Sequence, residues 1–402
     1  IFFRSRNLDY ISQNLIDLTK KTTASKIFEA LNSYSDNSEV RYVGGCVRKI
    51  IKKEIVDDID LATNLKPSEV CEALKEKEIN YYETGIEHGT ITAIIDNNKY
   101  EITSLRKDIS TDGRHAKVEF SLDWKEDAAR RDFSINSIYA DKDGNLFDPY
   151  NGKKDLESGN INFIGDAENR IKEDYLRILR YVRFFINYSN QSHNPKIIKI
   201  IKKNIGGVSK LSSERLLDEF KKLTRSTSVL NLFKDDICFE LIKIIFPQLK
   251  NLENFKKLNS HTQDNLSKVD FIFLLSLMIV DGTDNTDYFI YKFNLSKKDQ
   301  KRLKSIDLFY KENVNIKNFT EKNLNKIFYY NGKQTVLDII KFKLFTSFKV
   351  EKKLLKLIKI YKNKILPSFP IGANMIMTKY NIPEGKTLGN KLKLIEETWV
   401  QN

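Results

Sequence analysis

The segment 43–63, VGGCVRKIIKKEIVDDIDLAT, constrains the fold of the chain more than any other. Gly44 and Gly45 stand at the start of a short predicted helix, where open backbone N–H groups favour an anion such as phosphate. Asp58 and Asp60 follow on an apolar strand. Because side chains alternate along a strand, both carboxylates are expected on one face, where a divalent cation such as Mg²⁺ can offset their repulsion. The order favours phosphoryl-transfer chemistry, although a lone aspartate pair is more often a solvated surface feature.

A third carboxylate is predicted beside this pair. The runs 90–95 (TITAII) and 100–105 (YEITSL) are β-rich and flank the turn-forming residues 96–98, which predicts a hairpin. Glu101 lies on the returning strand. If that strand neighbours the aspartates, the three carboxylates form a set able to hold two metal ions. The alternative is an exposed strand glutamate.

The segment 125–139, KEDAARRDFSINSIY, carries groups suited to a triphosphate. Arg130 and Arg131 are adjacent, and arginine donates two parallel hydrogen bonds to phosphate. Asp132 and Asn136 are four residues apart, so a helix would place them on one face. The alternative is an amphipathic helix with a charged first turn.

Residues 169–185, NRIKEDYLRILRYVRFF, have the apolar spacing of a helix. Asp174 and Arg177 are three apart, with Arg180 one turn further on. A carboxylate accepts from an exocyclic amine and a guanidinium donates to a ring nitrogen, which matches the edges of cytosine and adenine and mismatches uracil and guanine. The alternative is a helix ion pair that contributes a few tenths of a kcal/mol.

Charge differs between the halves of the 402-residue chain. Residues 1–200 carry 31 Lys and Arg against 33 Asp and Glu, whereas residues 201–402 carry 37 against 21. The acidic half suits metal ions, and the basic half, with a net charge of +16, suits a polyanion such as RNA. A general lysine bias in composition explains the same excess.

Cysteine usage and hydropathy narrow the class of protein. The three cysteines are far apart with no C-x-x-C pair, which argues against zinc and disulfides and for a reducing compartment. No run approaches the ~18–20 apolar residues of a membrane span. Strand-like runs precede residue ~150 and helical patterns follow it, so the chain is predicted to be α+β.

Several motifs occur in order over residues 43–220. They are GGCVRK, DDIDLAT, YEITSLRKD, TDGRHA, RRDFSIN, FDPYNGKKDL, EDYLRILRYVRF and LSSERLLDEF. Together they resemble the class II tRNA nucleotidyltransferases, the CCA-adding enzymes, which share a DNA polymerase β-like head with the bacterial poly(A) polymerases. The C-terminal segment with PIGANMI also resembles that family, whereas residues 226–365 resemble it only in being helical and basic.

The resemblance implies an architecture and a reaction. It implies a mixed-sheet nucleotidyltransferase head (1–149), then an all-α neck with a nucleotide-selecting element (150–225), a body (226–310) and a tRNA-binding tail (311–402). The implied reaction adds C, C and A to the 3′ end of tRNA from CTP and ATP with two Mg²⁺ ions. A cytoplasmic monomer or homodimer without membrane association is expected.

The resemblance also implies roles for residues at matching positions. Asp58 and Asp60 resemble the metal-binding pair, and Glu101 is similar in position to the third catalytic carboxylate. The residues that match nucleotide-binding positions are Gly44, Gly45, Arg48, Arg130, Arg131, Asp132, Asn136, Glu173, Asp174, Arg177 and Arg180. Arg106, Asp108 and Arg114 fall in a segment similar to the flexible loop that allows the change from C to A addition. Glu214 and Arg215 resemble the element that braces the neck helix.

Departures from the family pattern leave alternatives open. Lys49 stands where the family usually has aspartate, which affects the local pairing of Arg48, and Tyr175 replaces a small residue or proline. One alternative is a poly(A) polymerase, which shares the head; another is an enzyme that adds only CC and lacks a working flexible loop. A third, from a different class, is a non-catalytic RNA-binding protein, but such a protein has no use for three mutually repelling carboxylates.

Overall fold

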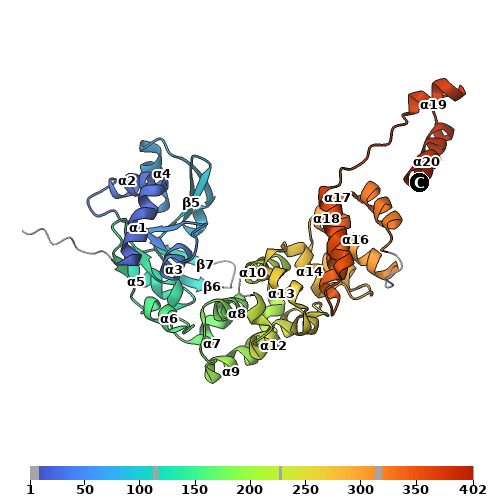
Figure 1. The fold of residues 1–402 in the computed structure, drawn as a ribbon. Coiled ribbons are helices and arrows are strands. Elements are labelled where there is room, and N and C mark those ends of the chain that lie inside the picture. Colours follow the sequence, from blue (N-terminus) through green and yellow to red (C-terminus); the bar gives the residue numbers. More distant parts are fainter. Residues whose placement is uncertain (1–8, 112–115, 226–228, 313–318, 402) are drawn as a thin grey trace, which may run out of the picture. The chain divides into compact units, whose positions relative to one another are not determined.

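The computed structural model describes residues 9–111, 116–225, 229–312 and 319–401 (Figure 1). It divides into two compact units, Ile1–Leu211 and Ser212–Asn402. All described strands lie in the first unit, and the described elements of the second unit are helical. The predicted α+β class is therefore confirmed. The boundary between the units falls within the segment 150–225 that the sequence predicted as a neck.

The first unit is built on a seven-stranded mixed sheet with strand order β3-β4-β5-β2-β1-β8-β9. The strands are β1 (Val40–Val43), β2 (Asp60–Thr63), β3 (Asn80–Gly85), β4 (Thr90–Ile95), β5 (Asn98–Ser104), β8 (Tyr139–Ala140) and β9 (Leu146–Phe147). β2 and β5 are parallel, and the other neighbouring pairs are antiparallel. β6 (Arg106–Thr111) and β7 (Ala116–Phe120) form a separate two-stranded sheet. The predicted hairpin of β4 and β5 is confirmed.

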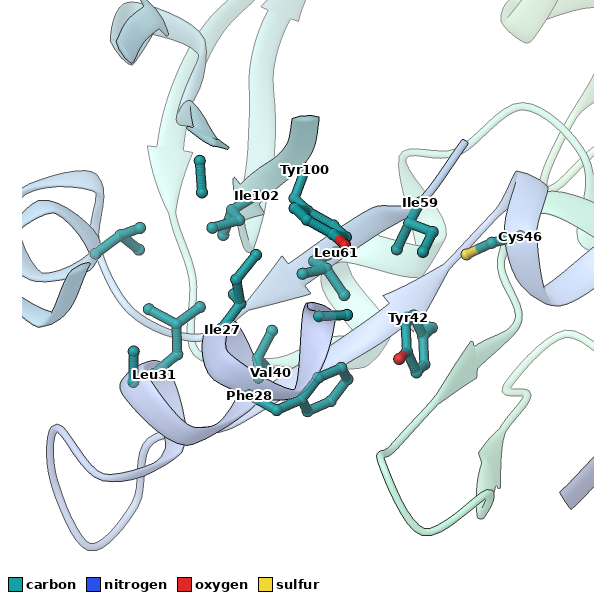
Figure 2. Packing of buried hydrophobic residues seen from close by; sticks show 14 of the residues in the cluster. Ile27, Phe28, Leu31, Val40, Tyr42, Cys46, Ile59, Leu61, Tyr100 and Ile102 are labelled. Atoms are coloured by element: carbon teal, nitrogen blue, oxygen red, sulfur yellow. The ribbon is translucent and has the colours of Figure 1, made fainter. Parts of the chain in front are cut away.

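Helices pack on this sheet because buried apolar side chains of the strands and of the helices form one cluster. The first four helices are α1 (Tyr10–Lys21), α2 (Ala24–Asn32), α3 (Gly45–Ile51) and α4 (Pro67–Glu76). Figure 2 shows Phe28 of α2 against the side chains of β1 and β2, and its ring centroid lies 4.8 Å from that of Tyr42. Leu61 and Ile102, from the parallel strands, are fully buried in the same cluster. This apolar layer fixes β2 against β5 and thereby the positions of Asp60 and Glu101 on these strands.

The remaining helices of the first unit differ from the predicted pattern in two places. They are α5 (Trp124–Ala129), α6 (Gly152–Ser158), α7 (Ala167–Glu173), α8 (Leu176–Tyr188) and α9 (Pro195–Asn204), with the 3₁₀ turns η1 (Ile86–His88), η2 (Ser134–Asn136) and η3 (Ile205–Lys210). The helix expected across 125–139 ends at Ala129, because the Asp132 carboxylate accepts a hydrogen bond from the backbone N–H of Phe133 and favours a turn. The single helix expected across 169–185 is also wrong. Asp174 is extended (φ −152°, ψ 104°), and its carboxylate accepts from the backbone N–H of Leu176 at 3.1 Å, which starts α8 anew.

The described elements of the second unit are helices, and an extended segment, 364–372, separates α18 from α19. The helices are α10 (Ser213–Thr224), α11 (Val229–Leu232), α12 (Asp236–Ile245), η4 (Leu252–Lys257), α13 (Ser260–Asn265), η5 (Leu266–Lys268), α14 (Phe271–Ile279), α15 (Asn285–Phe293), α16 (Lys297–Glu312), α17 (Glu321–Thr346), α18 (Lys352–Asn363), α19 (Ala373–Tyr380) and α20 (Lys386–Gln401). Arg302 of α16 joins three of them. Its guanidinium contacts both oxygens of Asp270, at the start of α14, at 2.7 Å and also pairs with the buried Asp338 of α17. None of the described helices is both long and apolar enough to cross a bilayer.

Candidate active site

A glycine turn between β1 and α3 forms one wall of the site. Gly44 has a φ of 68°, a conformation that side chains disfavour. A Cβ atom on Gly44 would lie 3.8 Å from Nη1 of Arg131, and one on Gly45 would lie 4.0 Å from Oδ2 of Asp60. The turn therefore runs close to both a guanidinium and a carboxylate, as expected for a backbone that approaches a ligand.

Three carboxylates meet where β2 and β5 run side by side. Asp60 and Glu101 are direct partners in the parallel register, so the predicted neighbourhood of the two strands is confirmed. β2 begins at Asp60, and Asp58 precedes the strand instead of lying on it as predicted. Burial raises the pKa of Asp60 to about 6, and the negative charges of Asp58 and Glu101 add to this, against the opposing charges of nearby arginines. An all-oxygen donor set in which carboxylates repel one another fits a hard divalent cation such as Mg²⁺.

The two predicted phosphate-binding arginines share one buried anchor. Asp127 of α5 is 1% exposed and accepts from Nε of Arg130 at 2.8 Å and from Nη2 of Arg131 at 3.1 Å. It also accepts from the Tyr139 hydroxyl at 2.6 Å. Burial alone would raise the pKa of Asp127, but the two guanidinium groups hold it down to about 2. The sequence analysis missed Asp127 and Tyr139, although the spacing of three and four residues from Asp127 to the arginines is a usable signal.

A second polar cluster joins the sheet to α8. Asn136 donates to Oδ1 of Asp132 at 2.9 Å, so the predicted pair is formed, but by a turn and not by a helix. Arg180 of α8 pairs with the other oxygen of Asp132 at 2.6 Å. Burial raises the pKa of Asp132, but the positive charge of Arg180 and the hydrogen bond from Asn136 outweigh it, so the net shift is downward. Arg48 donates to the side chain of Asn136 and lies 4.9 Å from the ring of Phe184. These contacts fix Arg48 beside the carboxylates.

Lys49, which stands where the family usually has aspartate, takes no hydrogen-bond partner away from Arg48. Lys49 forms an ion pair with the exposed Asp57, next to the carboxylate set, while Arg48 keeps Asn136 as its partner.

The predicted nucleotide-selecting residues surround the break between α7 and α8. Glu173 accepts from Nη1 of both Arg170 and Arg177, at 2.5 and 2.7 Å. The same nitrogen of Arg177 also donates to the main-chain oxygen of Arg170 at 2.6 Å. The salt bridge of Arg177 therefore runs to Glu173. Asp174 caps α8 through Leu176, so Asp174 and Arg177 flank the start of α8 and do not share one continuous helix.

Five other predicted site residues have no part in the contacts given above. Arg106 begins β6 and donates to the main-chain oxygen of His88, and the backbone of Asp108 pairs with β7. Arg114 falls outside the described residues. Glu214 and Arg215 lie in the first turn of α10 in the second unit. The roles predicted for these five residues stay predictions.

Comparison with known proteins agrees with this geometry. Residues 40–162 match the family model of the poly A polymerase head domain. The chain is 33% identical over 279 residues to the CCA-adding enzyme of Lactobacillus johnsonii, an alignment that covers 68% of each protein. This chain belongs to the CCA-adding enzyme family.

One further sequence relative and one solved structure show how much of the chain is similar to the family. The chain is 37% identical over 282 residues to the mitochondrial CCA tRNA nucleotidyltransferase 1 of Homo sapiens, covering 69% of this chain and 63% of the human protein. The fold is similar to a Bacillus stearothermophilus CCA-adding enzyme crystallised with CTP, with a TM-score of 0.72, 21% identity and coverage of 94% and 92%. Both units of the chain thus have the fold of the CCA-adding enzyme family.

Proposed function

We propose that the protein adds C, C and A to the 3′ end of tRNA, using CTP and ATP and releasing pyrophosphate. The observation that carries this proposal is the register of β2 and β5, which sets Asp60 beside Glu101 and next to the glycine turn. Carboxylates held next to one another repel, and such a group is typical of a functional site. Membership of the CCA-adding enzyme family and the names of the relatives support tRNA as the acceptor and CTP and ATP as donors.

The proposed reaction is a nucleotidyl transfer. The 3′ oxygen of the RNA forms a bond with the α-phosphorus, and its proton passes to water. The bond from that phosphorus to the oxygen shared with the β-phosphate breaks, and pyrophosphate leaves with that oxygen. Asp58, Asp60 and Glu101 would hold Mg²⁺, which when bound offsets the charge on the attacking and leaving oxygens. Arg130 and Arg131 bind the leaving phosphates. Asp127 keeps both guanidinium groups in place, so they need no reorganisation when the triphosphate enters.

Base selection is proposed to rest on Asp174 and Arg177. Glu173 and the main-chain oxygen of Arg170 hold one nitrogen of the Arg177 guanidinium, which fixes the plane in which it donates. A fixed donor beside a carboxylate discriminates strongly, because the wrong base leaves both groups unpaired. Cytosine and adenine share the matching edge, so one protein template serves both.

The basic second half is proposed to hold the tRNA. The net charge of +16 over residues 201–402 supports contacts with the phosphate backbone. Affinity for tRNA should therefore fall steeply as salt rises.

The test is to incubate the protein with tRNA lacking CCA and each labelled nucleotide, and to read product length. The expected result is two additions with CTP alone and three with CTP and ATP. A long ladder with ATP would assign the protein to the poly(A) polymerases, and arrest after two additions with both nucleotides would assign a CC-adding activity. No incorporation by folded, tRNA-binding protein would leave the non-catalytic alternative.

A further inference from the structure

A cavity in the second unit has no part in the proposed chemistry. It measures 420 Å³, within the range of about 300–1,000 Å³ typical of sites for one small ligand. It lies between η4, the end of α14, α16 and the last turn of α17. Its walls are formed mainly by apolar and aromatic side chains, among them Phe255, Leu277, Tyr310, Phe342 and Phe345. Planar, apolar ligands fit such walls.

The lining of the cavity carries a net positive charge. Lys257 and Lys343 both line the cavity, and among the residues that the structure describes no aspartate or glutamate forms an ion pair with either of them. No aspartate or glutamate is among the lining residues. Cations and basic peptides are therefore disfavoured, and an anionic group near the mouth is favoured.

An exposed aromatic ring completes the mouth. Phe348, in the turn after α17, lines the cavity and is 83% exposed. Proteins that bind single-stranded nucleic acids combine an aromatic side chain, on which a base stacks, with positively charged side chains near the phosphate backbone. Phe348, Lys257 and Lys343 provide the same combination here. The hydroxyl of Tyr310, which also lines the cavity, has no hydrogen-bond partner among the described residues and offers a polar contact to a base edge.

We propose that this cavity binds one unpaired nucleobase of an RNA, stacked on Phe348, with the adjoining phosphates near Lys257 and Lys343. The proposal rests on the proposed function, since RNA is the acceptor there. It adds a site in the second unit that reads the presence of an unstacked base, beyond the general attraction of a basic surface for phosphates.

The experiment uses the full chain and a single-stranded oligoribonucleotide carrying one 2-aminopurine, whose fluorescence is quenched when the base stacks. Phe348→Ala removes the stacking ring, and Asn254→Trp places a large side chain at an exposed position that lines the cavity. Tyr291→Ala is the matched control, because Tyr291 is 85% exposed in the same unit and does not line the cavity.

Both cavity variants should bind the oligonucleotide roughly tenfold more weakly and lose the quench, while Tyr291→Ala behaves as wild type. Phe348→Ala should leave the salt dependence unchanged because no cation is lost, whereas Lys257→Ala should reduce its slope by about 0.7. Affinity for a blunt-ended RNA duplex, which has no unpaired base, should be the same in wild type and Phe348→Ala.

Unchanged binding and quenching in both cavity variants would overturn the proposal, and an apolar peptide that binds the cavity in place of RNA would do so as well. The two proposals fail separately. If the protein completes CCA on tRNA while the cavity variants bind RNA as wild type does, only the cavity assignment is wrong. If wild type incorporates no nucleotide yet shows the cavity-dependent quench, the proposed function is wrong and the RNA site stands.

Discussion

Asp127 offers the sharpest test of how the phosphate-binding arginines are held. It is almost fully buried and is the shared acceptor for Arg130, Arg131 and the Tyr139 hydroxyl. Asp127→Asn keeps the shape of the side chain and removes its charge. The variant therefore leaves two partly buried guanidinium groups without their counter-charge.

The size of the effect follows from the pKa of Asp127. Burial opposes ionisation, yet Arg131 and Arg130 lower the pKa from 3.8 to about 2. At 1.36 kcal/mol per pKa unit, this shift corresponds to roughly 2.5 kcal/mol of folding free energy. Breaking a buried ion pair on one side costs about 3–5 kcal/mol, so Asp127→Asn should lose about 3 kcal/mol at pH 7. Because the pKa is depressed on folding, the contribution is present above pH ~4 and is lost as the pH falls towards 2.

Urea unfolding followed by Trp124 fluorescence measures this directly, in a Trp399→Phe background so that the signal comes from one tryptophan. Trp124 packs edge-on against Tyr139 at 5.4 Å between ring centroids, so it reports on the same cluster. Tyr139→Phe is the milder control and should cost about 1 kcal/mol. Asp127→Asn should also raise KM for CTP. A loss below 1 kcal/mol at pH 7, or a loss that does not shrink as the pH falls below 4, would refute the argument.

Three further variants test other parts of the structure. Arg177→Ala should lower kcat/KM for CTP and ATP together and narrow their advantage over UTP and GTP; retained discrimination among the four nucleotides would reduce this residue to a structural role. Gly207→Ala should displace the ring of Tyr175, whose atoms would lie 2.1–2.3 Å from the new Cβ, and so raise KM for both nucleotides. Gly206→Ala, with nothing within 4 Å of its Cβ, is the matched control and should bind both nucleotides as wild type does. Arg302→Ala should lower the free energy of unfolding of the second unit in urea by about 3–5 kcal/mol. A change under 1 kcal/mol would contradict the view that Asp270 and Asp338 need Arg302 as their counter-charge.

Local patterns were sufficient to predict the centre of the site. The hairpin of β4 and β5 has alternating apolar residues around a polar turn, and its apolar face packs in the core with β2. Given that pairing, Asp60 and Glu101 have to be neighbours. The glycine pair was also predictable, because it marks a backbone conformation that other residues disfavour.

Features that depend on side-chain capping were not predictable from periodicity. Asp174 sits inside an apolar pattern of helical period, yet its carboxylate binds the backbone N–H of Leu176 and interrupts the helix. Asp132 ends the preceding helical pattern in a similar way through Phe133. Periodicity records which face is apolar and does not record this competition between side chain and backbone. Asp127 was missed because it touches no ligand itself and acts through the arginines it holds.

The most direct test of the proposed active site is CMP incorporation into tRNA lacking CCA by Asp60→Asn, with Mg²⁺ present. Asp57→Asn is the matched control, because Asp57 is an adjacent aspartate with a side chain that is 73% exposed and lies outside the carboxylate set. The proposed site predicts no detectable incorporation by Asp60→Asn, with tRNA affinity and urea unfolding close to wild type, and substantial incorporation by Asp57→Asn. Turnover by Asp60→Asn at the wild-type rate would contradict the assignment of the active site to the place where Asp60 of β2 pairs with Glu101 of β5.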